Sequence, residues 1–182
     1  MVEKGTQMKE RLLQLLKGCI SKERVVLSSG KVSSFYIDGR LITLHPEGAF
    51  LVASLMLDII EDMEVDAVGG PTLGADPICG AIALLSHLRG KPIPTFIVRK
   101  EPKTHGMRKH IEGALEKDMR VALVDDVVTT GSSLLRVARI LREGGHVVKG
   151  AVVIVDREEG AEESLKKENI PLYPLFRKQE LL

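Results

Sequence analysis

The chain has little of several features that mark whole classes of protein. Only two cysteines occur among its 182 residues, and they form no Cys-x-x-Cys pair, so neither a disulfide framework nor a cysteine zinc site is expected. Aromatic residues make up only 3% of the chain. Lysines and arginines number 26 against 25 aspartates and glutamates, which leaves a net charge of +1. This balance argues against a dedicated nucleic-acid-binding protein, because such binding depends on a basic excess.

Long apolar runs and common nucleotide-binding signatures are also missing from the sequence. The most apolar uncharged stretch, Pro77–Leu88, is too short to span a bilayer. The N-terminal residues are charged and amphipathic, unlike a signal peptide. Neither Gly-x-x-x-x-Gly-Lys-Ser/Thr nor Gly-x-Gly-x-x-Gly occurs, so a P-loop and a dinucleotide fingerprint are both unsupported. We therefore expect a soluble, cytoplasmic protein that binds neither membranes nor nucleic acid.

The apolar pattern that is present predicts an α/β fold. A length of 182 residues favours a single domain, taken as 1–182. Apolar, β-branched segments alternate with segments of helical spacing, which is typical of a central, mostly parallel sheet flanked by helices. Ligands of such sheets bind beyond the carboxyl ends of the strands. The expected strands are 66–70, 93–98, 120–124, 146–155 and 172–176, and the expected helices are 9–16, 46–63, 131–142, 161–167 and one that ends near residue 89.

The most specific motif is the segment 121–133, VALVDDVVTTGSS. Two carboxylates, Asp125 and Asp126, follow a predicted buried strand, and small hydroxyl residues with a glycine then begin a helix. Backbone N–H groups converge on an anion in such a turn, and the helix N-terminus favours negative charge. Carboxylates can accept hydrogen bonds from sugar hydroxyls or hold a divalent cation. The motif therefore predicts a sugar-phosphate site. A capped helix start is the alternative for the turn alone.

This pattern resembles the type I phosphoribosyltransferases, which bind 5-phosphoribosyl 1-diphosphate (PRPP) with Mg²⁺. The resemblance implies their fold, with a small N-terminal hood over roughly residues 1–45. It also implies that Asp125 and Asp126 hold the ribose hydroxyls and lie near a Mg²⁺ that is held mainly through PRPP. The other PRPP contacts that it implies are Val127, Val128 and the 5-phosphate-binding residues Thr129, Thr130, Gly131, Ser132 and Ser133.

A second signal is the basic segment 99–106, RKEPKTHG, which follows a predicted strand. A run of bases is also typical of a solvated loop, but this one leaves the same edge of the sheet as the phosphate turn. The segment resembles the catalytic loop of orotate phosphoribosyltransferases, which reaches into the neighbouring subunit and so implies a homodimer. No role is assigned to Arg108, Lys109 or His110. The residues with implied catalytic and PRPP-binding roles are Arg99, Lys100, Lys103 and His105.

Three further segments resemble the same family. Residues 29–38 are similar to its base-covering motif, which implies that Phe35, Tyr36 and also Thr129 contact orotate; packing in the core is the alternative for the aromatic pair. Arg157 matches the arginine that faces the orotate carboxylate, a planar group that a guanidinium fork suits, with a surface salt bridge as its alternative. Residues 69–76 resemble the diphosphate loop. Some family members carry lysines where this chain has Ser28 and Gly74, so how the diphosphate is held stays open.

The implied reaction is transfer of the phosphoribosyl group from PRPP to orotate, which gives orotidine 5′-phosphate and diphosphate in de novo pyrimidine (UMP) biosynthesis. Two alternatives stay open. The chain could be a phosphoribosyltransferase for another base, or a catalytically inactive regulator that binds PRPP. The basic loop and Arg157 favour orotate over another base. The intact loop bases, the balanced charge and the short N-terminal helix argue against a regulator.

Overall fold

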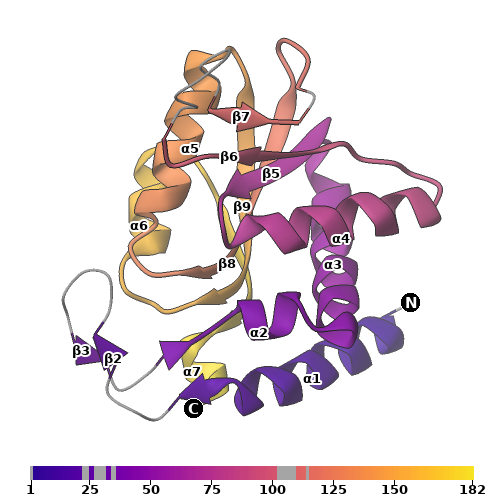
Figure 1. Ribbon diagram of the computed structural model, residues 1–182, viewed down its shortest axis with the longest axis vertical. Coiled ribbons are helices and arrows are strands. Elements are labelled where there is room, and N and C mark those ends of the chain that lie inside the picture. The colour runs from indigo at the N-terminus through magenta and orange to yellow at the C-terminus, as the bar shows by residue number, and fades with distance from the viewer. Residues whose placement is uncertain (1, 22–24, 27–31, 34–35, 102–109, 114) are drawn as a thin grey trace.

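The computed structural model confirms an α/β fold with a mostly parallel central sheet (Figure 1). It describes residues 2–21, 25–26, 32–33, 36–101, 110–113 and 115–182. Within these residues, the main sheet has the strand order β10-β9-β8-β5-β6-β7. All neighbouring strands run parallel except β6 and β7, which form an antiparallel pair at one edge. The strands are β5 (Ala67–Pro71), β6 (Thr95–Val98), β7 (Ile111–Glu112), β8 (Arg120–Val128), β9 (Val147–Asp156) and β10 (Leu172–Arg177).

Helices cover both faces of this sheet, with α3 and α4 on one side and α5 and α6 on the other (Figure 1). Side chains of β8 alternate between the two layers, because successive residues of a strand point to opposite faces. Ala122 and Val124 pack on the α3 and α4 side, whereas Val121 and Leu123 pack on the α5 side. The helices are α1 (Val2–Gly18), α2 (Arg40–Thr43), α3 (Pro46–Ile60), the 3-10 turn η1 (Glu61–Met63), α4 (Ala75–Leu88), α5 (Ser132–Glu143), α6 (Ala161–Lys167) and α7 (Lys178–Leu181).

The spacing of apolar residues explains why α5 lies where it does. Leu134, Val137, Ala138 and Leu141 recur at helical intervals and are all buried against the sheet. The opposite side of the helix carries arginines. α5 therefore has one fixed face toward the sheet, and its first turn is held at the carboxyl edge of β8.

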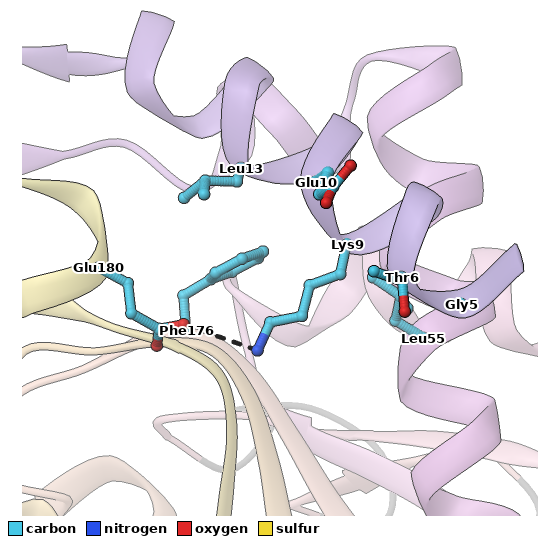
Figure 2. Close-up of a pocket in the computed structure, with 8 residues that line it drawn as sticks. All are labelled: Gly5, Thr6, Lys9, Glu10, Leu13, Leu55, Phe176 and Glu180. Carbon is cyan, nitrogen blue, oxygen red and sulfur yellow. Dashed lines mark ion pairs between the residues drawn. The ribbon is translucent and has the colours of Figure 1, made fainter. Parts of the chain in front are cut away.

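The N-terminal helix α1 packs against α3 and the C-terminal end of the chain (Figure 2). Leu12 and Leu16 are fully buried. Lys9 Nζ lies 3.6 Å from Glu180 and 5.2 Å from the centre of the Phe176 ring. These side chains line a pocket of about 420 Å³ that contains none of the predicted site residues. Residues after α1 form two short antiparallel pairs, β1 (Ile20–Ser21) with β4 (Tyr36–Ile37) and β2 (Val25–Val26) with β3 (Val32–Ser33).

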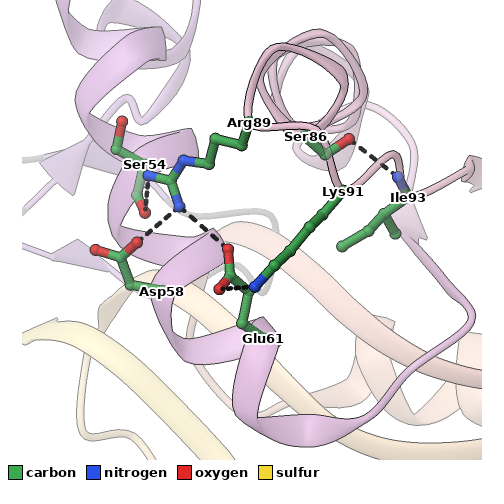
Figure 3. A network of polar contacts seen from close by, with 7 residues as sticks. All are labelled: Ser54, Asp58, Glu61, Ser86, Arg89, Lys91 and Ile93. Atoms are coloured by element: carbon green, nitrogen blue, oxygen red, sulfur yellow. Dashed lines mark hydrogen bonds and ion pairs between the residues drawn. The ribbon is translucent and has the colours of Figure 1, made fainter.

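A polar network joins the C-terminal ends of α3 and α4 (Figure 3). Arg89 Nη1 lies 2.7 Å from Asp58 and 3.5 Å from Glu61, and its Nη2 donates to the Ser54 carbonyl at 3.2 Å. Lys91 adds a second cation to Glu61 at 3.2 Å. Exposed pairs of this kind contribute at most about 1 kcal/mol each. They hold the C-terminal end of α4 against α3.

The structure corrects several predicted boundaries. β8 continues to Val128 and includes both aspartates, rather than ending at Val124, because β9 supplies backbone partners as far as Asp156. No strand was predicted between residues 98 and 120, but Ile111 and Glu112 form β7. Two short helices, α2 and α7, were not predicted, since four residues are too few for a periodic signal. None of the described helices is both long enough and apolar enough to cross a membrane.

Candidate active site

The predicted phosphate segment lies where the direction of the sheet connections reverses. From β5 the chain crosses to β6 on one side, whereas from β8 it crosses to β9 on the other. β5 and β8 pair only as far as Gly69 and Leu123, but β8 continues along β9 to Val128. The carboxyl edge of a parallel sheet binds ligands at this kind of switch point. From Asp125 onward, β8 therefore pairs with β9 but not with β5.

Two adjacent carboxylates occupy this end of β8. Asp125 is only 8% exposed, and Asp126 is half-buried. The Asp126 backbone N–H donates to Asp125 Oδ1 at 3.0 Å, and the Val127 N–H donates to Asp126 Oδ1 at 2.7 Å. Burial raises the pKa of Asp125 well above its usual range, and the charge of Asp126 raises it further. Burial also raises the pKa of Asp126, which the nearby Arg40 guanidinium partly opposes. A ligand that brings hydroxyl hydrogens or a cation to this pair would stabilise its ionised form, which burial otherwise disfavours.

Glycines from two other segments approach these carboxylates closely. A Cβ atom at Gly74 would overlap Asp125 Oδ1 and would lie 2.6 Å from Asp126 Oδ1. A Cβ atom at Gly39 would lie 2.7 Å from the Asp126 side chain. No side chain fits at either position without displacing the carboxylates. The β5–α4 turn, which is the predicted diphosphate loop, therefore lies directly against the aspartate pair.

Arg40 is a cation of the site that the sequence reasoning did not identify. Its guanidinium forms two bonds with Asp38, at 2.9 and 3.1 Å, across the glycine that abuts Asp126. It interacts electrostatically with both Asp126 and the half-buried Tyr36 of β4. The Asp-x-Arg spacing is the signal that could have revealed it.

The turn from β8 to α5 has the conformation that the phosphate motif predicts. Gly131 adopts a left-handed conformation, with φ of 79°, and Ser132 begins α5. Thr130, Ser132 and Ser133 are exposed, and Thr129 is half-buried. A twelve-residue helix begins here. Its first backbone N–H groups and the positive end of its dipole are therefore directed toward an anion held in the turn. The turn can therefore bind an anion.

Arg157 lies at the carboxyl end of β9, next to the phosphate turn. Its backbone N–H donates to the Val128 carbonyl at 3.0 Å. The side chain is buried, and its Nη2 lies 2.8 Å from Glu159. Arg157 therefore forms an ion pair, but its own side chain is only 5% exposed, whereas Glu159 is 35% exposed.

The basic loop begins and ends on the β6–β7 pair. Arg99 and Lys100 are exposed at its start, and Arg99 Nε lies 3.7 Å from Glu112 of β7. The Thr72 N–H donates to the Val98 carbonyl at 3.1 Å, so the diphosphate loop and the basic loop leave adjacent strand ends. Four predicted or discussed site positions lie outside the described residues, namely Ser28, Phe35, Lys103 and His105.

Comparison with known proteins agrees with this geometry. Residues 41–171 match the phosphoribosyl transferase domain family. The crystal structure of Mycobacterium tuberculosis orotate phosphoribosyltransferase in complex with Fe(III) dicitrate superposes with a TM-score of 0.84 at 36% identity, covering 96% of this chain and 98% of that one. An adenine phosphoribosyltransferase from Leishmania donovani, at 21% identity and a TM-score of 0.70, shares the fold. Fold and site together define a phosphoribosyltransferase.

Sequence relatives narrow this class further. The orotate phosphoribosyltransferase of Aquifex aeolicus is 49% identical over 178 residues, which cover 96% of this chain and 97% of the relative. That of Pyrococcus furiosus is 44% identical, with coverage of 96% and 95%. The chain belongs to the orotate phosphoribosyltransferase family.

Proposed function

We propose that the chain transfers the 5-phosphoribosyl group of PRPP to orotate, with orotidine 5′-phosphate and diphosphate as products, as a step in pyrimidine (UMP) biosynthesis. The observation that carries this proposal is the continuous segment from Asp125 to Ser133. It joins two adjacent carboxylates to a turn that can bind an anion, at the switch point of the sheet. Among relatives, the M. tuberculosis orotate phosphoribosyltransferase has been solved in complex with PRPP.

The substrate would lie with its ribose over the aspartates and its 5-phosphate in the turn. Asp125 and Asp126 would accept hydrogen bonds from the ribose hydroxyls, which would satisfy carboxylates that burial otherwise disfavours in their ionised form. Backbone and hydroxyl groups of Thr129–Ser133 would bind the phosphate, continuing from Val127 and Val128. This places the reacting ribose carbon toward the diphosphate loop.

Magnesium fits the residues that are present. Carboxylate oxygens are hard donors, and Asp125 and Asp126 stand side by side, yet no group of three or more His, Cys, Asp or Glu side chains able to hold a metal occurs among the described residues. An ion held mainly by the diphosphate of PRPP, with this pair nearby, matches the way Mg²⁺ usually binds through one or two carboxylates and substrate phosphates. Bound there, it would offset the negative charge of the leaving diphosphate.

The basic loop would supply the remaining charge. Arg99 and Lys100 leave the strand end next to the diphosphate loop, and Lys103 and His105 follow in the sequence. Orotate is already an anion and can attack without a strong base, so catalysis would consist of positioning the reactants and stabilising the departing diphosphate.

The base would lie between Arg157 and the N-terminal segment. The guanidinium of Arg157, at the end of β9, would face the orotate carboxylate, with Thr129 and Tyr36 as further contacts and Phe35 from the same motif. The N-terminal residues, roughly 1–45, would form a hood over the site within a single domain of 1–182. Family resemblance supports two further parts of the proposal, a homodimer that shares the basic loop and a cytoplasmic location.

Orotate consumption, followed by its ultraviolet absorbance, tests this proposal. We expect loss of orotate that requires both PRPP and Mg²⁺ and that stops when EDTA is added. Asp126→Asn should abolish turnover, whereas Asp62→Asn, at an exposed position outside the site, should not change it. PRPP binding without turnover of any base would favour the regulator instead.

A further inference from the structure

Arg136 of α5 makes a contact that the proposed reaction has not yet used. Its Nη1 donates to the Arg99 carbonyl at 2.9 Å and lies 3.4 Å from the Lys100 carbonyl. Both carbonyls belong to the first residues after β6, where the basic loop begins. A guanidinium has five donors and no acceptor, so it can serve two adjacent carbonyls at once.

The backbone around this contact is fixed on its other side by the sheet. The Arg99 N–H donates to the His110 carbonyl at 2.8 Å, which extends the β6–β7 pairing of Val98 with Ile111 by one step. Beyond that bond, no described residue of the sheet donates a backbone hydrogen bond to the carbonyl of Arg99 or Lys100. The Arg136 side chain therefore holds these two carbonyls at the point where the backbone pairing with β7 stops.

The other end of the contact lies on the helix that begins in the phosphate turn. Arg136 is one turn after Ser132, the first residue of α5, and the buried stripe of Leu134 and Val137 holds this part of the helix against the sheet. A shift of α5 would thus move the start of the basic loop with it. The geometry ties Lys100 to the element that would bind the 5-phosphate of the substrate.

We propose that Arg136 is a positioning residue for the transfer reaction, because it fixes the start of the basic loop to the phosphate-binding helix and so places Lys100 relative to bound PRPP. The inference rests on the proposed function. Arg136 itself touches backbone and is not assigned a contact with substrate.

The test compares Arg136→Ala with Arg139→Ala, an exposed arginine three residues further along the same helix. Both changes remove an arginine from α5 and have the same effect on helix propensity. For Arg136→Ala we expect kcat to fall about tenfold, whereas the KM for PRPP should stay within about twofold. The reason is that a misplaced Lys100 would stabilise the departing diphosphate less well in the transition state. Arg139→Ala should match the unchanged chain.

Two further readouts separate positioning from general stability. Arg136→Lys should have a kcat about threefold higher than that of Arg136→Ala, because an ammonium can still donate to one carbonyl. Amide hydrogen exchange over residues 95–101 should quicken in Arg136→Ala but not in Arg139→Ala. Identical kinetics for the two alanine variants would overturn the inference, as would a loss in Arg136→Ala that follows a lowered Tm and that lysine does not relieve.

Failure of the proposed function gives a different pattern. If the unchanged chain does not consume orotate, yet amide exchange over residues 95–101 still quickens in Arg136→Ala, the contact of Arg136 with the loop is supported and the proposed reaction is wrong. If the unchanged chain is active and exchange does not change, only the role of Arg136 falls.

Discussion

Asp125→Asn should stabilise the ligand-free chain while abolishing its activity. The carboxylate is 8% exposed and stands beside Asp126, so its ionised form is disfavoured both by burial and by a like charge. Asparagine has the same shape, and its Oδ1 can still accept the Asp126 N–H. The variant therefore removes a buried charge without creating a cavity.

The expected size follows from the cost of ionisation. Because the Asp125 side chain is only 8% exposed, we expect a gain at pH 8 of about 1–3 kcal/mol, which is the usual desolvation cost of a buried polar group. For a chain of this length each kcal/mol raises the Tm by about 2–4 °C. Activity should vanish, because asparagine removes the charge that would bind the ribose hydroxyls.

The pH dependence of this gain has a definite sign. Because the pKa of Asp125 is higher in the folded chain than its ordinary value of 3.8, the folded state binds more protons between those two values. The stability of the unchanged protein therefore falls as the pH rises through that window, and the cost is absent below it. The advantage of Asp125→Asn should be largest at pH 8 and should shrink toward pH 4.

Thermal unfolding in EDTA, without substrate, measures this directly. Asp62→Asn is the matched control, since Asp62 is exposed. A lower Tm for Asp125→Asn at pH 8, or a gain that stays constant down to pH 4, would refute the reasoning.

Three other changes test neighbouring parts of the site. Gly74→Ala places a Cβ against Asp125 Oδ1 and should lower kcat/KM for PRPP by at least about tenfold. The control is Gly80→Ala, whose Cβ meets nothing within 4 Å and which should leave kcat/KM unchanged. Equal activity of the two variants would contradict the close approach of Gly74 to the aspartates. Gly131→Ala forces a side chain to φ of 79° and should cost about 1 kcal/mol in thermal unfolding and raise the KM for PRPP; unchanged values would show that the turn tolerates it. Lys103→Ala should lower kcat far more than it raises KM; an unchanged kcat with a raised KM would contradict a role in the transition state.

Much of the fold was predictable because the strands are buried on both sides. Continuous apolar runs such as 120–124 and 146–155 indicated strands of a parallel sheet, and the helix Ala161–Lys167 was predicted with its observed bounds. The predictions failed where partners rather than local sequence decide the structure. β8 extends through two aspartates because β9 pairs with them, and β7 exists only because β6 offers an edge.

The part of the site formed by consecutive residues could be predicted from the sequence, whereas the part formed by residues from separate segments could not. Asp125–Ser133 is one segment, so its chemistry could be deduced from consecutive residues. Arg40 approaches Asp126 from α2, and Arg136 lies on α5 beyond the phosphate segment and contacts the start of the basic loop. Neither residue lies in a motif of phosphate-binding or basic residues. The glycines of the diphosphate loop were expected to allow close approach to the ligand, whereas the structure shows that Gly74 lies against the aspartates.

The most direct test of the account is base selectivity. The measurement is kcat/KM with PRPP and Mg²⁺ for orotate, adenine, hypoxanthine and xanthine under the same conditions. The account predicts turnover of orotate and none of the purines, because a buried arginine at the end of β9 suits a carboxylate that purines lack. Turnover of a purine without turnover of orotate would contradict it.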